Sequence, residues 1–349
     1  ESEIATNRAG TEWLRSTVAP LGYEVHPMPM KGTILHLLGI MVLIREGLLL
    51  LHRNELLCEL PEPLKEWNVI ELSEDEAKAY ATVGVSLDEQ RYIIPSGLGR
   101  VCDGLVKRGV EPIEIDFWGG FIWFRLESDN TSLLSFLGDI PEHLAPYRIE
   151  DMRLLEYKTF LWDSNWKVAC DAFNESYHFR GLHPQMLKWA DEKARIELLG
   201  DHSRMINKYG TTSAPFTGGE EIYPELREWM LYNGMNPDDY EGAPEDVWKA
   251  KTAFTRNIQD QDDITAPYAD MTDEQLTDVY HYFIFPGFAM NVFPEGINGF
   301  RYRPHESDPE KMYYDLIMLA HYPKGTEIPC ERKFFGEKVQ YDEIADTPM

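Results

Sequence analysis

The chain has 349 residues, of which 43% are hydrophobic and 27% are charged, a composition typical of a globular protein with more than one domain. Its formal net charge of −27 at pH 7 arises from 60 acidic and 33 basic residues. Such a charge repels nucleic acids and anionic membranes, so we expect neither as a partner. The four cysteines show no Cys-x-x-Cys spacing, which indicates a reduced, cytoplasmic protein.

The first part of the sequence predicts a short helix around Thr11–Val18, with no recognisable signal peptide before it. The apolar stretch Ile34–Leu51 contains charged residues and glycines, so we expect it to be too polar for a membrane helix. It instead predicts two buried strands, Leu37–Ile44 and Leu48–His52, joined by a tight turn. We therefore expect a soluble protein.

Short apolar runs separated by turn signals continue to residue 126, and alternating strand and helix patterns follow from Leu154. Among the latter, the sequence predicts helices at Lys167–Tyr177 and Gln185–Ala194. The overall pattern predicts an α+β fold. We expect an N-terminal helix and connection at 1–32, a β-rich domain at 33–126, and an antiparallel sheet with helices at 127–349.

One segment carries a pattern with chemical meaning, Asn165-Trp-Lys-Val-Ala-Cys-Asp-Ala-Phe-Asn-Glu-Ser-Tyr-His-Phe-Arg-Gly-Leu-His-Pro184. His178 and His183 are five residues apart, a spacing that suits a helix end followed by a bend rather than one helix face. Glu175 lies one turn before His178. Two imidazoles and one carboxylate form the facial triad that holds Fe(II) with positions open for dioxygen.

This segment resembles the iron-binding motif of Rieske non-haem iron (aromatic-ring-hydroxylating) oxygenase α subunits, Asn-Trp-Lys followed by Glu/Asp-x-Tyr-His-x4-His-Pro. The resemblance implies that His178 and His183 bind a mononuclear Fe(II) ion. It also implies that Glu175 bridges to the Rieske cluster of a neighbouring subunit. The stretches Phe117–Glu127 and Ile284–Asn298 are similar to strands of the same family. Residues 33–126 then correspond to a Rieske-like β domain and residues 127–349 to a helix-grip catalytic domain.

The Rieske domain of this family holds a [2Fe–2S] cluster through Cys-x-His and Cys-x-x-His pairs. In this chain Cys58 stands at the first ligand place, and Leu60, Lys78 and Ala81 stand at the other three. One thiolate cannot hold the cluster, so we expect a retained β fold without a [2Fe–2S] cluster.

The family's third iron ligand is an Asp on a C-terminal helix, which the resemblance places just after the segment Val339–Pro348. Either that ligand lies beyond the printed sequence, or Asp342, Glu343 or Asp346 takes its place.

The sequence leaves three functions open. The first is an oxygenase subunit that oxidises a small apolar aromatic, polycyclic or steroid-like substrate. It would receive electrons from a cluster-bearing α-type partner, which is itself reduced by ferredoxin and reductase. The two kinds of subunit would form a trimer-based hetero-oligomeric ring. The second is a non-catalytic α-like subunit that completes such a ring. The third is a ligand-binding protein without iron.

Overall fold

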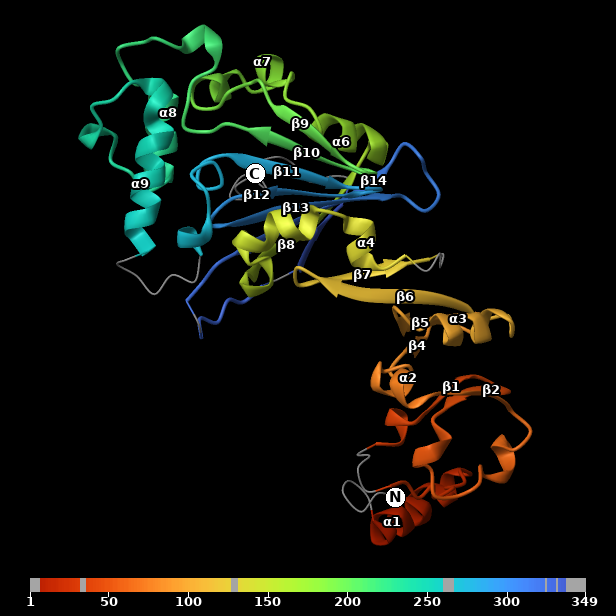
Figure 1. The fold of residues 1–349 in the computed structure, drawn as a ribbon. Helices are drawn as coiled ribbons and strands as arrows, with labels where there is room; N and C mark the ends of the chain where they lie inside the picture. The colour runs from red at the N-terminus through yellow and green to blue at the C-terminus, as the bar shows by residue number, and fades with distance from the viewer. Residues whose placement is uncertain are drawn as a thin grey trace. The chain divides into compact units, whose positions relative to one another are not determined.

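The computed structural model describes residues 7–31, 36–126, 131–259, 267–323, 325–330 and 332–336. The chain divides into two compact units, Glu1–Phe136 and Leu137–Met349. Both combine sheets with helices, which confirms the predicted α+β class (Figure 1).

The first unit contains two small sheets. Strands β1 (Met41–Arg45), β2 (Leu48–Leu51) and β3 (Asn68–Glu71) form one, in that order. Strands β4 (Val85–Ser86), β5 (Arg91–Pro95), β6 (Glu111–Trp118) and β7 (Phe121–Arg125) form the other. Each sheet contains one parallel pair, β2 with β3 and β5 with β6.

Strand β2 consists of four buried leucines and therefore feeds two apolar cores, since successive side chains point to opposite faces of a sheet. Leu48 and Leu50 pack in a cluster with residues of β5 and of helix α3 (Gly99–Val106). Leu49 and Leu51 pack on the other side with Met28, Ile40 and neighbouring apolar residues. Helices α1 (Arg8–Val18) and α2 (Glu74–Lys78) complete the unit.

The last of the short apolar runs expected before residue 126 is divided in the structure by the Gly119-Gly120 turn. Both glycines have positive φ, 62° and 80°, and Trp118 pairs with Phe121. Two left-handed residues make the tight turn that a two-residue hairpin requires, so β6 and β7 form a hairpin. The Gly-Gly pair was the signal that could have indicated this turn.

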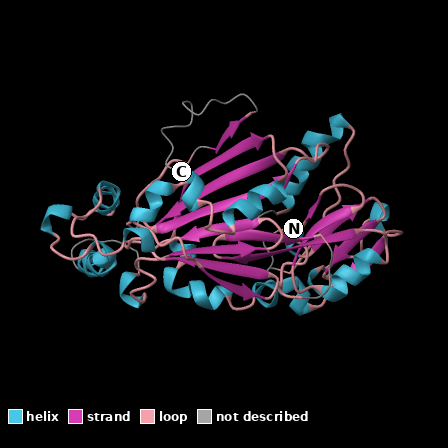
Figure 2. Ribbon diagram, turned by 90° about the horizontal axis from the view of Figure 1, so that it is seen from above, coloured by secondary structure: helices cyan, strands magenta, loops and turns pink. Residues whose placement is uncertain are grey.

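The second unit is built on one eight-stranded sheet, in the order β15-β8-β14-β13-β12-β11-β10-β9. Figure 2 shows these strands side by side in one layer. All neighbours are antiparallel except β15 and β8, which are parallel. The strands are β8 (Arg153–Trp162), β9 (Arg195–Leu199), β10 (His202–Asn207), β11 (Val279–Ile284), β12 (Phe288–Val292), β13 (Gly296–Pro304), β14 (Met312–Ala320) and β15 (Arg332–Phe335).

Helix α4 (Leu133–Leu137) lies at the boundary between the two units. The described α-helices of the second unit are α5 (Ile140–Leu144), α6 (Trp166–Phe173), α7 (Phe179–Leu182), α8 (Pro224–Tyr232) and α9 (Val247–Gln259). Helix α6 packs on β13 and β14 through Ala169 and Cys170, in a cluster with Phe300 and Tyr314. Helices α8 and α9 lie side by side through Leu226, Met230 and Val247 (Figure 1).

The predicted helix at Gln185–Ala194 is wrong. A short 3-10 helix spans Pro184–Lys188, and Ala190 then forms an isolated bridge with Tyr209. The next regular elements are strands β9 and β10, where no strand was predicted. The assignment of domains to residues 1–32, 33–126 and 127–349 stays a prediction. No helix in the described part of the chain has both the length and the apolarity needed to cross a membrane.

Candidate functional site

Helix α6 is held by contacts at both of its ends, and these contacts position the residues that follow it in the chain. Asn165 caps its start by accepting a hydrogen bond from the Lys167 backbone N–H at 3.0 Å. The Asn165 side-chain amide also donates to the Pro309 carbonyl at 2.7 Å. At the other end, the Phe173 ring lies 5.1 Å from the ring of Phe300. The segment that follows Phe173 therefore starts from a rigid support.

Glu175 is bound to His178 by two hydrogen bonds. Its Oε1 lies 2.6 Å from His178 Nδ1, and its Oε2 accepts the His178 backbone N–H at 3.1 Å. A carboxylate accepts hydrogen bonds, so this contact places the proton of a neutral imidazole on Nδ1. The lone pair of Nε2 is then left to act as a metal ligand, the usual arrangement of a carboxylate, histidine and metal.

His178 and His183 stand at the two ends of the one-turn helix α7. The His183 backbone N–H donates to the Phe179 carbonyl at 3.0 Å, which closes the turn. The two imidazole rings lie 5.4 Å apart between centroids and are inclined by 75°. The short helix therefore brings the two rings close to one another.

The segment that follows α7 contacts the motif through Glu192, which binds Ser176 and Arg180. Ser176 is buried, and its hydroxyl donates to the Glu192 carbonyl at 2.7 Å. The Glu192 carboxylate pairs with the Arg180 guanidinium, a contact that lowers the pKa of Glu192. Glu175 and His178 are therefore held by the elements on both sides of them.

The donor set fits an iron site only in part. Two imidazoles, one of them oriented by a carboxylate, suit Fe(II). In the described part of the chain, however, this pair belongs to no group of three or more His, Cys, Asp or Glu residues whose ligand atoms all lie within 4.8 Å of one another. The possible third ligands Asp342, Glu343 and Asp346 lie outside the described residues.

The four expected cluster places carry side chains with other roles. Leu60 and Ala81 are buried in two different apolar clusters. Lys78 is exposed at the end of α2 and pairs with Glu74 at 3.1 Å. Cys58 is half-buried, and desolvation is the main cause that raises the pKa of its thiol.

One set of three possible ligands was missed by the sequence reasoning. His52, Glu55 and Glu74 each offer an atom that lies within 4.8 Å of the other two. His52 and Glu55 are three residues apart, but nothing in the sequence placed Glu74 beside them. This set is in the first unit, whereas the histidine pair is in the second.

The sequence profile described as "Ring hydroxylating alpha subunit (catalytic domain)" matches residues 148–335, more than half of the chain. A glycine betaine monooxygenase oxygenase subunit of Chromohalobacter salexigens is 28% identical over 83 residues, which are 24% of this chain and 19% of the relative. The protein of the same name from Pseudomonas aeruginosa is 30% identical over 80 residues, which are 23% of this chain and 19% of the relative. The matches thus span about a fifth of the length of these curated relatives.

Solved structures show a weaker likeness. A quaternary ammonium Rieske monooxygenase studied for carnitine oxidation and inter-subunit electron transfer has a TM-score of 0.39 and 13% identity. That match covers 66% of this chain and 50% of the other. The match to the catalytic-domain profile includes the whole of the Asn165–Pro184 segment. The chain therefore belongs to the ring-hydroxylating α subunits, the family of Rieske-type oxygenase subunits.

Proposed function

We propose that this chain is an oxygenase subunit in which His178 and His183 bind a mononuclear Fe(II) ion. The observation that carries the proposal is the 2.6 Å contact between Glu175 Oε1 and His178 Nδ1, next to the His183 ring at 5.4 Å. Iron bound there supplies open coordination positions for dioxygen. Glu175 holds the proton on Nδ1, and His178 and His183 present their remaining ring nitrogens.

The electrons come from a Rieske cluster on a partner α-type subunit, which ferredoxin and reductase reduce in turn. Two of the four cluster places are filled by packed apolar side chains and a third by a paired lysine, which supports a chain without its own cluster. The Glu175 side chain is 17% exposed, so a partner surface can reach it. Glu175 then has a second role as the bridge between subunits, within a trimer-based hetero-oligomeric ring.

By its resemblance to ring-hydroxylating α subunits, the chain takes a small apolar substrate, either aromatic, polycyclic or steroid-like. The rings of Phe173, Tyr302 and Tyr314 pack against one another in the buried cluster beneath α6, so they stabilise the fold and do not themselves identify the substrate. Aromatic rings also bind quaternary ammonium groups through cation–π attraction, and two relatives are named for glycine betaine. A panel containing both classes of compound distinguishes these two substrate types.

The test uses mixed complexes in which only this chain can hold catalytic iron. A cluster-bearing α-type partner is prepared with alanine at its own iron-ligating histidines, then combined with this chain, ferredoxin and reductase. We expect oxygenated product from at least one panel compound, detected by mass spectrometry with labelled dioxygen. His178→Ala with His183→Ala in this chain should abolish the product, whereas the control His305→Ala should not.

Three results would contradict the proposal, each in a different way. Full activity of this chain without the partner would refute the electron route. Product that survives loss of both His178 and His183 would refute the iron assignment. A complex that assembles and stays inactive with every compound would favour the non-catalytic subunit, a reading that fits the absence, in the described part of the chain, of a three-ligand group around the histidine pair.

A further inference from the structure

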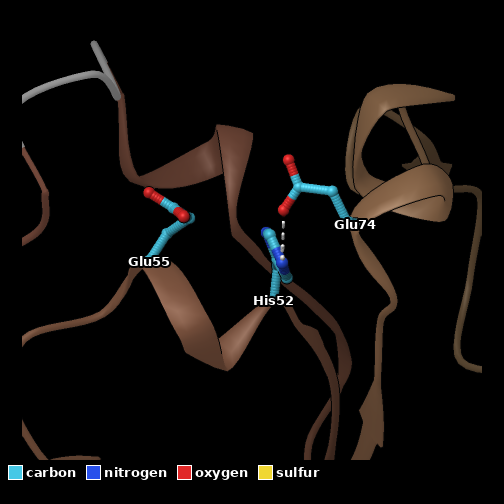
Figure 3. Close-up of side chains that lie close together, drawn as sticks. All are labelled: His52, Glu55 and Glu74. Carbon is cyan, nitrogen blue, oxygen red and sulfur yellow. Dashed lines mark ion pairs between the residues drawn. The ribbon is translucent and has the colours of Figure 1, made fainter.

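Three side chains of the first unit converge on one point, far along the chain from the histidine pair. His52 follows β2, Glu55 ends the 3-10 helix Arg53–Glu55, and Glu74 begins α2. The His52 backbone N–H donates to the Ile40 carbonyl at 2.7 Å, and Ser73 caps α2. Figure 3 shows the His52 ring between the two carboxylates. Regular elements therefore fix the backbone of all three residues.

The His52 imidazole is buried and lacks a hydrogen bond at one of its two nitrogens. The residue is 3% exposed, and its buried Nε2 has no hydrogen-bond partner in the described part of the chain. The nearest acid oxygen is Glu74 Oε2, 3.5 Å away. Leaving a buried polar atom unsatisfied costs free energy, so such atoms commonly indicate a ligand or ion.

One oxygen of each carboxylate forms an ion pair with a lysine. Lys31 Nζ lies 3.3 Å from Glu55 Oε1, and Lys78 Nζ lies 3.1 Å from Glu74 Oε1. The side chains of Lys31 and Lys78 are 48% and 70% exposed, so these two ion pairs contribute little to the free energy of folding. The hydrogen bond from Lys78 is the main cause that lowers the pKa of Glu74, so this carboxylate is ionised at neutral pH.

We propose that His52, Glu55 and Glu74 form a binding site for one divalent first-row transition-metal ion, for which Zn²⁺ is the probe. One imidazole and two carboxylates suit such an ion, with water in the remaining position. With bonds of about 2.1 Å, neighbouring ligand atoms of a tetrahedral ion lie roughly 3.4 Å apart. The His52 to Glu74 separation of 3.5 Å matches that value. A metal would join the end of β2 to the start of α2.

This site is independent of the proposed oxygenase function, and the experiment keeps the two apart. The full chain carries His178→Ala and His183→Ala, so the histidine pair of the second unit cannot bind metal. Zn²⁺ is titrated by isothermal calorimetry after removal of bound metals. We expect one Zn²⁺ per chain with micromolar or tighter affinity.

Variants then locate the bound ion. In the same background, Glu74→Gln should weaken Zn²⁺ binding at least about tenfold, because it removes a charged ligand. Glu71→Gln is the matched control, since Glu71 is similarly exposed, 52% against 57%, and pairs with Arg53 outside the set. Lys78→Gln should change Zn²⁺ affinity much less than Glu74→Gln does, because the exposed ion pair of Lys78 with Glu74 is weak.

His52→Gln should abolish binding, with circular dichroism to confirm that the variant folds. If His52→Gln does not fold, the contrast between Glu74→Gln and Glu71→Gln decides the question. The proposal is overturned if Zn²⁺ does not bind at micromolar concentrations. It is equally overturned if Glu74→Gln and Glu71→Gln bind Zn²⁺ alike.

Discussion

Replacing Glu175 by Gln tests how the proposed iron site is oriented. The substitution keeps the length and shape of the side chain but removes its negative charge. In the wild type, the carboxylate accepts His178 Nδ1–H at 2.6 Å and the His178 backbone N–H at 3.1 Å. The glutamine amide has one accepting oxygen where the carboxylate has two, so it can keep the bond to His178 Nδ1 but loses the bond to the His178 backbone N–H. The imidazole then faces a neutral acceptor, and its Nε2 becomes less basic.

The magnitude follows from the kind of hydrogen bond that is lost. A hydrogen bond to a charged group contributes about 1.5–3 kcal/mol and a neutral one about 0.5–1.5 kcal/mol, so the exchange costs about 1–1.5 kcal/mol. That difference is about five- to tenfold in a dissociation constant. It lies at the lower end of the effects known for residues that orient metal ligands. We therefore expect Glu175→Gln to weaken Fe(II) binding about tenfold.

The assay is an anaerobic Fe(II) titration against a chromophoric chelator. Asp171→Asn is the control, because Asp171 is an exposed acid on α6, one turn before Glu175. In the mixed complex, Glu175→Gln should also lower turnover while native mass spectrometry shows unchanged assembly. Equal Fe(II) affinities for Glu175→Gln and Asp171→Asn would refute the orienting role.

Three further outcomes are expected. Asp315 is fully buried and holds Arg301 at 2.7 Å and Arg303 at 2.8 Å, so Asp315→Asn should lower the free energy of unfolding by about 3 kcal/mol in urea denaturation. Burial lowers the pKa of His281 to about 4, whereas the pKa of a histidine in an unfolded chain is near 6.5. The contribution of neutral His281 to stability is therefore present above about pH 6.5 and is lost as the pH falls toward 4. Asp278, whose pKa burial raises to about 6, acts in the opposite sense in this range, so the measurement is the difference between wild type and His281→Gln, up to about 3 kcal/mol. Anaerobically purified protein should contain no acid-labile sulfide, and roughly two sulfides per chain would show that a [2Fe–2S] cluster is present.

Most of the fold follows from local patterns in the sequence. The helix expected around Thr11–Val18 is observed as Arg8–Val18, where Asn7 caps the start. The predicted strand Leu48–His52 appears as β2 (Leu48–Leu51), whose side chains are buried on both faces. The predicted strand Leu37–Ile44 is observed only in its second half, as β1 (Met41–Arg45), because Leu37–Gly39 forms a 3-10 helix. The wrong helix at Gln185–Ala194 has a physical cause. Ser176 and Arg180 bind Glu192, and these tertiary contacts hold the segment in an irregular path.

The residues of the histidine site could be predicted from the sequence because they are close together along the chain. Glu175, His178 and His183 lie within nine residues, so one turn of helix brings them together. The set of His52, Glu55 and Glu74 was not accessible, because it depends on where α2 begins relative to the end of β2. That arrangement is determined by packing in the first unit rather than by spacing along the chain.

The most direct test of the central claim is the iron content of the purified chain. The wild-type protein and the His178→Ala/His183→Ala variant are incubated anaerobically with a small excess of Fe(II), desalted and analysed for iron. Circular dichroism confirms that both are folded, and His305→Ala serves as the control. The proposed site predicts that the double variant binds one iron per chain less than the wild type and the control. Equal iron in all three proteins would show that the histidine pair does not bind iron.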